Sequence, residues 1–148
     1  MEWICKKFDD LTAWELYLSL QLRNEVFVVE QNCVFQDADN KDPYCYHFMC
    51  FEEKKLLAYT RLVPAKVCYD EISIGRVVTS PSARQLGLGR ELMQRSIMQA
   101  YSLFGRNQDI KIGAQLYLKK FYESFDFYQF GDIYLEDGIP HIEMLRRK

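Results

Sequence analysis

The chain has 148 residues, of which 49% are hydrophobic and 15% aromatic, and its formal net charge is −2. This length predicts one domain, residues 1–148, with a hydrophobic core large enough to fold without disulfides or a metal. The balanced charge argues against nucleic-acid binding, because the only basic block is the tail Arg146-Arg147-Lys148, which we interpret as a solvated C-terminus.

The start of the chain predicts a strand followed by a long helix. Residues 2–8 have the composition of a strand, and Leu11 to Gln31 has the apolar spacing of a helix, with Asp10 or Thr12 as its N-cap. From residue 23 onward this helix mixes apolar and charged side chains. Two interpretations of that end are equally open: a helix wall that faces a cleft, or a buried helix end.

The segment after this helix contains Asp37, Asp39 and Asp42, spaced as at the start of a calcium loop. However, Lys41 stands where the fifth ligand is needed, and the twelfth position carries Phe48 instead of a carboxylate. We therefore predict a turn-rich loop that binds no calcium.

Two segments of alternating pattern, residues 44–51 and 56–63, predict a β-hairpin. Cys45 and His47 share one face of the first strand while Cys50 points to the other, so we expect no zinc site and no other metal. The five cysteines have no framework spacing, and the chain has neither a signal-peptide core nor an apolar run long enough to span a membrane. These features predict a cytoplasmic protein without a membrane partner.

The centre of the chain joins a strand to a helix through a loop that contains glycine. Residues 72–79 are β-branched and apolar and are closed by Pro81, and residues 88–101 have helical spacing. The loop at residues 84–89 enters this helix directly.

Gly87 and Gly89 in this loop favour the binding of a phosphate or pyrophosphate. Glycine lets the backbone approach a ligand, and the first turn of a helix offers unpaired N–H groups and the positive end of the helix dipole. A P-loop would need lysine after Gly89, where Arg90 stands, and a dinucleotide fingerprint would need a third glycine, where Leu92 stands. Both of these motifs are excluded.

The remainder predicts a strand at residues 110–115, a short amphipathic helix at 116–125 and a hairpin. The hairpin strands, residues 128–135 and 139–145, flank the turn pair Asp137-Gly138. No linker divides the chain. The predicted order is therefore strand, helix, three strands, helix, strand, helix and two strands.

The pattern Arg84-x-x-Gly87-x-Gly89, after a strand that ends in Val78-x-x-Pro81, resembles the acetyl-CoA pyrophosphate loop of the GNAT superfamily of N-acetyltransferases. The predicted order of elements is also that of this superfamily. A second motif, Ala114 followed by Phe121-Tyr122 and then Asp126-Phe127, resembles its Ala…Tyr-x-x-x-Gly-Phe motif, with Asp126 in place of glycine. Aspartate tolerates left-handed backbone conformations better than most residues, so the role of the glycine can survive.

Longer phrases are similar to the ElaA-like branch of the superfamily and cover nearly the whole chain. They are residues 23–31, Asp39-x-x-Asp42 with His47, residues 74–78, Ala114-Gln115 and residues 136–141. The resemblance implies an α/β (α+β) GNAT-like fold: a mixed, mostly antiparallel twisted sheet with helices on both faces. It also implies a V-shaped splay between the strands at 72–79 and 110–115.

The resemblance implies an N-acetyltransferase in which a primary amine of a small molecule or peptide attacks the thioester of acetyl-CoA directly. The strand before the loop would present main-chain groups of Val77, Val78 and Thr79, with the Val78 N–H as donor to the thioester oxygen. Backbone N–H groups of the loop would hold the pyrophosphate: Gln85, Leu86, Gly87, Leu88, Gly89 and Arg90. Side chains of Arg84 and Arg90 either add positive charge there or pair with carboxylates on the surface.

Tyr122 matches the family's tyrosine that protonates the leaving thiolate, although a core-packing role is also open. For the base we rank His141 and Glu71 as candidates, with a structural role equally open for the histidines, His47 and His141. We expect the acceptor side of the site to be formed by Phe27, Glu30, Gln31, His47, Arg76 and Gln115.

Two other functions remain open: an acyl-CoA-binding regulatory module without turnover, and an interaction protein whose aromatic cleft binds a peptide. The presence of Tyr122 favours the enzyme over the first, and the intact loop from Arg84 to Gly89 argues against the second. Composition and spacing leave both a monomer and a homodimer open and do not identify the acceptor.

Overall fold

The computed structural model describes residues 1–148, and its strands form two antiparallel sheets. The first has the strand order β1-β2-β3-β4, with bounds Glu2–Lys7, Tyr46–Glu52, Lys55–Val63 and Ser73–Thr79. The second has the order β5-β7-β6, with bounds Ile110–Gln115, Ile139–Arg146 and Tyr128–Glu136. The helices are α1 (Ala13–Arg23), α2 (Leu88–Phe104) and α3 (Lys119–Glu123).

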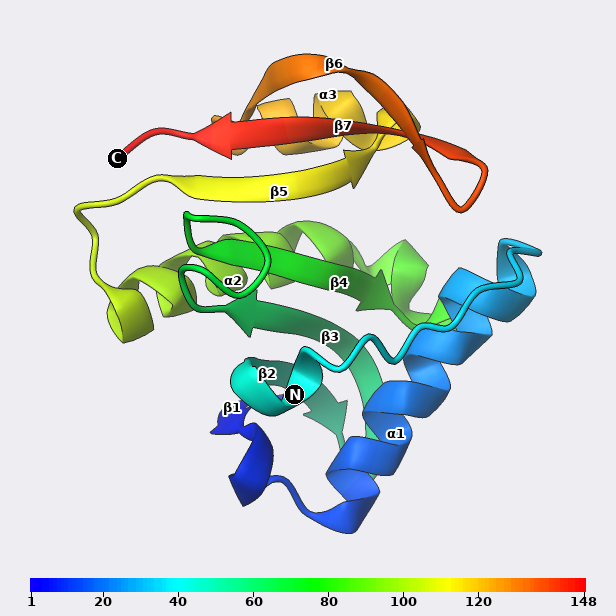
Figure 1. Ribbon diagram of the computed structural model, residues 1–148. Helices are drawn as coiled ribbons and strands as arrows, with labels where there is room; N and C mark the ends of the chain where they lie inside the picture. Colours follow the sequence, from blue (N-terminus) through cyan, green and yellow to red (C-terminus); the bar gives the residue numbers. More distant parts are fainter.

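The two sheets meet at one point, between the start of β4 and the start of β5. Ile72 and Ile110 form a parallel bridge, and the Lys111 N–H donates to the Ile72 carbonyl oxygen at 3.0 Å. Beyond this bridge β4 and β5 diverge (Figure 1). The predicted V-shaped splay is confirmed, and it is wide enough to divide the predicted sheet into two.

Helices cover both faces of the first sheet, as predicted. On one face α2 buries Leu92, Met93 and Ile97 in the larger core, which also contains Ile112 and Met144 of the second sheet. On the other face α1 and the segment after it contribute to a smaller core. Figure 1 shows α1 in front of β3 and β4 and α2 behind them. None of the helices has the length and hydropathy that a membrane-spanning helix requires.

The predicted helix from Leu11 to Gln31 has two parts. Thr12 caps α1: its hydroxyl oxygen accepts from the Glu15 N–H at 3.1 Å, and the Glu15 carboxylate accepts from the Thr12 N–H at 2.8 Å. After Arg23 the chain continues as a π-helical segment, η2 (Asn24–Glu30), in which the Gln31 N–H donates to the Val26 oxygen. The widened turns change which side chains face the sheet, and such segments frequently occur at functional sites.

Two turns that the sequence predicts have the expected backbone. Asp137 and Gly138 have φ of 52° and 77°, as the tight turn between β6 and β7 requires. Asp126 has φ of 68°, so aspartate takes the left-handed conformation in place of the expected glycine. The segment predicted as one short helix begins as a 3₁₀ turn, Leu116–Leu118, before α3.

Candidate active site

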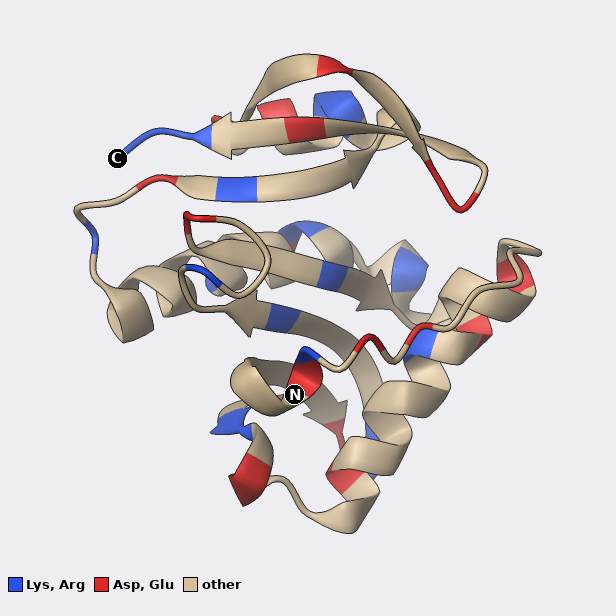
Figure 2. Cartoon of the chain, viewed as in Figure 1, with Lys and Arg blue, Asp and Glu red and all other residues tan.

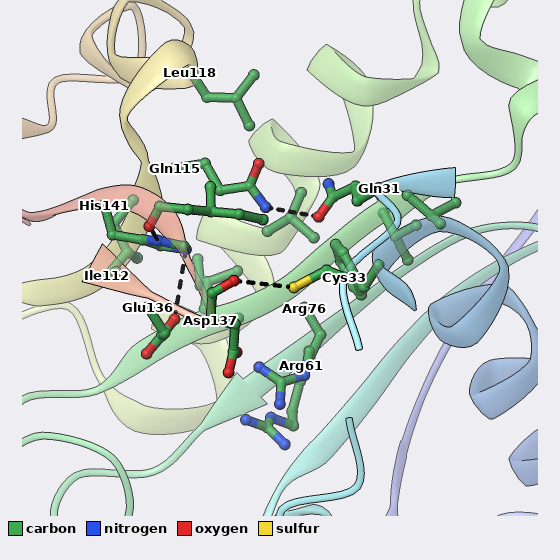
Figure 3. Close-up of a pocket in the computed structure, with 18 of the residues that line it drawn as sticks. Gln31, Cys33, Arg61, Arg76, Ile112, Gln115, Leu118, Glu136, Asp137 and His141 are labelled. Carbon is green, nitrogen blue, oxygen red and sulfur yellow. Dashed lines mark hydrogen bonds and ion pairs between the residues drawn. The ribbon is translucent and has the colours of Figure 1, made fainter. Parts of the chain in front are cut away.

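A cavity of about 980 Å³ lies where β4 and β5 diverge. Its walls are β4, the end of β5, the hairpin of β6 and β7, and the π-helical segment with the loop that follows it. Figure 3 shows these side chains converging from the two sheets and the α1 side of the molecule. The divergence of the sheets therefore creates a site for a ligand.

A β-bulge in β4 shapes one wall of this cavity. Tyr59 pairs with Val78 and Arg61 with Gly75, so Thr60 alone lies opposite both Arg76 and Val77. Arg76 has φ of 50°, a conformation that is uncommon for a residue other than glycine and costs of order 1–3 kcal/mol. The bulge interrupts the ladder and directs the Arg76 side chain to the cavity.

The register of β3 and β4 corrects the expected role of Val78. The Ser80 N–H donates to the Leu57 oxygen at 2.8 Å, which makes residues 57 and 80 a hydrogen-bonded pair. Because antiparallel pairs alternate, Ala58 and Thr79 are a non-hydrogen-bonded pair, and Tyr59 and Val78 are hydrogen-bonded again. The Val78 N–H thus faces β3, while the Thr79 N–H faces the open edge.

Tyr122 of α3 lines the cavity and is almost fully buried. Burial raises the pKa of its hydroxyl, and the neighbouring Tyr117 raises it further, so the phenol is neutral and can donate a proton. This hydroxyl makes no hydrogen bond within the chain, and its ring packs edge-on against Phe121 and Phe127. The donor is therefore free for a ligand while the ring is held in place.

His141 of β7 lines the same cavity. Its Nδ1 lies 2.7 Å from the Ile139 carbonyl oxygen, so Nδ1 carries the proton. Its Nε2 lies 3.5 Å from a Glu136 carboxylate oxygen, and its ring stacks on Tyr134. In the neutral ring Nε2 holds a lone pair and can accept a proton, with Glu136 placed to stabilise the cation.

Two of the expected site residues lie elsewhere. His47 is buried, with Nε2 at 3.0 Å from the Asp42 carbonyl oxygen and Nδ1 at 2.7 Å from the Tyr59 hydroxyl. Burial lowers its pKa, and its role is structural. Glu71 lies in a separate, smaller hollow with Lys66 and Lys111, outside the cavity that contains Tyr122. The expectations of an acceptor contact for His47 and of a base at Glu71 are therefore corrected.

The loop before α2 forms a second feature, next to the cavity. Gly87 has φ of 69° and is the N-cap of α2, and no side chain caps the helix. A Cβ added at Gly87 or Gly89 would meet no atom within 4 Å, so the backbone there faces open space. Leu88 is buried in the core, whereas Gln85 and Leu86 are exposed. The uncapped N–H groups of α2 are thus available to an anion.

Both arginines of the loop have partners within the chain. Arg84 forms an ion pair with Glu30 of the π-helical segment, with Nη1 at 2.9 Å from Oε2, and this contact lowers the pKa of Glu30. Arg90 donates to the Ser124 hydroxyl at 3.1 Å and lies over the Phe125 ring. The pair of Arg84 and Glu30 lines the cavity, and Arg90 does not.

The remaining expected acceptor residues meet in the cavity. Phe27 and Gln31 come from the α1 side, and Gln115 from the end of β5 donates to the Gln31 side chain at 3.2 Å. A second contact that joins the two walls was not predicted: the Cys33 thiol donates to the Asp137 carbonyl oxygen at 3.2 Å (Figure 3). These two hydrogen bonds link the α1 side of the cavity to the second sheet.

A network of three arginines and three aspartates supports the cavity wall and was missed in the sequence. Its members are Arg23, Arg61, Arg76, Asp37, Asp39 and Asp42. Arg23 Nε lies 2.7 Å from Asp37 Oδ2, and Arg61 binds both oxygens of Asp39 at 2.8 and 3.0 Å. Figure 2 shows the acidic loop beside basic residues of α1, β3 and β4. The available signal was Arg61, a charged residue between the apolar side chains of β3.

Comparisons with known proteins agree with this geometry. The model of the acetyltransferase (GNAT) domain matches residues 20–148. A UPF0039 protein of Schizosaccharomyces pombe is 39% identical over 145 residues, which cover 97% of this chain and 95% of that protein. Protein ElaA of Escherichia coli is 36% identical over 148 residues, which cover 99% of this chain and 96% of ElaA, and its crystal structure superposes with a TM-score of 0.92. An acyl-CoA N-acyltransferase of Pseudomonas aeruginosa is 43% identical, with a TM-score of 0.91 and 99% of each chain covered.

The arginine–aspartate network makes the stability of the chain depend on pH. Burial alone would raise the pKa of Asp39, but the hydrogen bonds and charge of Arg61 lower it from 3.8 to about 2. A carboxylate whose pKa is lower in the folded state stabilises the fold above its unfolded pKa and loses this effect as the pH falls through the folded pKa. We expect the free energy of unfolding to fall as the pH is lowered from about 4 to about 2. In Asp39→Asn this pH dependence should be shallower by up to about 1.4 kcal/mol per pH unit, because one proton-binding group is lost. Urea unfolding at several pH values measures the slope, with the exposed Asp9→Asn as control, and an unchanged slope in Asp39→Asn would contradict the prediction.

Proposed function

The chain belongs to the GNAT family of acetyltransferases, and from this premise we propose that it transfers the acetyl group of acetyl-CoA to a primary amine. The observation that carries the proposal is the combination, in one cavity, of the open edge of β4, the unbonded Tyr122 hydroxyl and the imidazole of His141, whose Nδ1 is held by the Ile139 carbonyl oxygen. We further propose the cytoplasm as its compartment, because all five cysteines are free thiols.

The residues present fit an acyl-CoA in two places. The uncapped N-terminus of α2, with open space in front of Gly87 and Gly89, suits the pyrophosphate. The open edge of β4 suits the extended amide-containing arm, because the Thr79 N–H faces that edge and Val77 lies in the bulge without a β3 partner of its own. One of these two amides donates a hydrogen bond to the thioester oxygen in our proposal. This bond stabilises the negative charge that develops on the oxygen during attack.

His141 and Tyr122 divide the proton transfers of the reaction. The acceptor nitrogen forms a bond to the carbonyl carbon, the C–S bond breaks, and the thiolate leaves with the electron pair. His141 Nε2 takes a proton from the nitrogen, and the carboxylate of Glu136 stabilises the resulting cation. The neutral Tyr122 hydroxyl gives its proton to the departing sulfur.

The ion pair between Arg84 and Glu30 affects how the cofactor enters. Arg84 follows the β4 edge and precedes the glycines, so its guanidinium can exchange the Glu30 carboxylate for a phosphate oxygen of the cofactor. The pair is exposed, and an exposed ion pair contributes only about 0–1 kcal/mol, so a small free energy opposes the exchange.

Gly89→Glu tests the pyrophosphate site. Gly89 has space for a side chain in the free protein, so the fold should be unaffected, while the added carboxylate repels a phosphate and blocks the first turn of α2. We expect the affinity for CoA, measured by calorimetry, to fall by at least about tenfold, the loss of one charge-assisted hydrogen bond or more. Gln94→Glu places the same charge on an exposed position further along α2 and should retain the affinity. Equal affinity of Gly89→Glu and the wild type for CoA would contradict a pyrophosphate site at this loop.

Tyr122→Phe tests the proton donor. Because the hydroxyl has no partner within the chain, its removal should leave stability and acetyl-CoA binding almost unchanged. We expect kcat, measured by thiol release with an acceptor that the wild type uses, to fall by roughly 10²–10⁴-fold, the usual effect of general acid catalysis. Tyr46→Phe removes a hydroxyl outside the cavity and should have no effect.

The outcome of this variant also separates the two functions. A folded Tyr122→Phe protein with full kcat would contradict the catalytic role of the hydroxyl. Tight CoA binding by the wild type without turnover of any amine would instead favour an acyl-CoA-binding regulatory module.

A further inference from the structure

Arg76 presents an unused hydrogen-bonding edge to the cavity. Its Nη2 donates to the Asp37 carbonyl oxygen at 2.9 Å, and its Nε lies 2.9 Å from Asp37 Oδ1. Nη1 makes no hydrogen bond within the chain. Unlike Nε, which is buried, Nη1 is accessible from the cavity. The bulge that holds Arg76 in a left-handed conformation is what turns this edge toward the cavity.

Lys41 adds a second unpaired positive charge to the same cavity. Its main chain is fixed, since its N–H donates to Asp39 Oδ1 at 3.1 Å, but its ammonium forms no ion pair and no hydrogen bond. Both groups belong to the wall formed by β4 and the loop at residues 37–42.

Positive charge exceeds negative charge on this wall of the cavity. The three arginines and three aspartates of the network balance in charge, and each aspartate is already engaged by at least one guanidinium. Lys41 and the free edge of Arg76 therefore remain as a net positive, donor-rich surface. A carboxylate is the ligand group that suits it, because such a group accepts several charge-assisted hydrogen bonds at once.

The opposite wall has the reverse character. Glu136 and Asp137 of the hairpin turn bring carboxylates to the cavity beside His141 (Figure 3). An ammonium group is the natural partner of that wall, and the proposed base lies there. The cavity thus has one wall that offers unpaired positive charge and another that offers carboxylates.

The direction of β4 assigns the wall with Arg76 and Lys41 to the acceptor rather than to the cofactor. The proposed pyrophosphate site follows the C-terminal end of β4, after Thr79, whereas Arg76 precedes the proposed thioester site at Val77 and Thr79. A cofactor that runs along β4 from the α2 end reaches the bulge with its thioester. Arg76 and Lys41 lie beyond the thioester, on the side away from the cofactor.

We infer that the acceptor is an amine that also carries a carboxylate, such as an α-amino acid, with the carboxylate bound between Arg76 and Lys41 and the amine beside His141. This inference rests on the proposed function for the identity of the reacting group. It adds the substrate class, which the acyl-transfer activity alone leaves open. Binding of the carboxylate breaks and forms no covalent bond.

The first test compares standard α-amino acids with their carboxamides, which keep the shape and the amine but lose the negative charge. We expect the wild type to acetylate the best amino acid with kcat/KM about 10–100-fold above its carboxamide, the effect of charge-assisted hydrogen bonds. Arg76→Gln and Lys41→Met should each reduce this ratio. Arg106→Gln and Lys54→Met, which change exposed residues without partners outside the cavity, are the matched controls and should retain it.

The second test needs no turnover. N-acetyl-amino acids are the expected products and keep the carboxylate, so NMR titration of the protein with them, and with their carboxamides, measures carboxylate recognition directly. We expect the carboxylate form to bind more tightly by a similar factor, with resonances of Arg76 and Lys41 shifted. If no amine is acetylated but this preference persists and depends on Arg76, the inference stands and the proposed transferase activity fails.

Equal binding and equal turnover of carboxylates and carboxamides by the wild type would overturn the inference while leaving acyl transfer intact. Arg76→Gln leaves Asp37 without one of its partners and can unfold the chain. In that case Lys41→Met decides, because its ammonium supports no contact within the fold: a reduced preference supports the inference, and an unchanged preference overturns it.

Discussion

The separation of β4 from β5 beyond the bridge at Ile72 and Ile110 is the constraint on which the rest of the structure depends. Backbone N–H and C=O groups need partners, and an edge strand inside a molecule leaves them unpaired unless water or a ligand supplies them. Here α2 and the larger core hold both sheets, so the edge cannot close. The open edge, the cavity and the positions of Tyr122 and His141 all follow from this divergence.

The buried ion-pair network has a different purpose from the hydrophobic cores. Desolvation of charges is unfavourable, and a buried ion pair is often no more stabilising than apolar residues of the same volume. Its effect here is to position: the loop at residues 37–42 has little regular structure, and its aspartates attach it to α1, β3 and β4. The same contacts hold Arg76 against the cavity, so the wall that faces the acceptor is ordered before any ligand binds.

Much of the fold could be predicted because its signals are local. Strand alternation, the turn pair Asp137-Gly138 and the glycine loop before α2 depend on neighbouring residues and have the predicted structure. The direction of the Val78 N–H could not be predicted, since it depends on the β3–β4 register and the bulge. The positions of His47 and Glu71, and the pairing of the acidic loop with Arg23, Arg61 and Arg76, depend on contacts between residues distant in sequence.

The central claim is that the open edge of β4 is the binding surface for an acyl-CoA. Amide hydrogen exchange of Val78 and Thr79, followed with and without CoA, tests it most directly. The account predicts that Thr79 exchanges rapidly in the free protein and at least about tenfold more slowly when CoA is bound, while Val78 is protected in both states by its pairing with Tyr59. Unchanged exchange at Thr79 in a protein saturated with CoA would contradict the account.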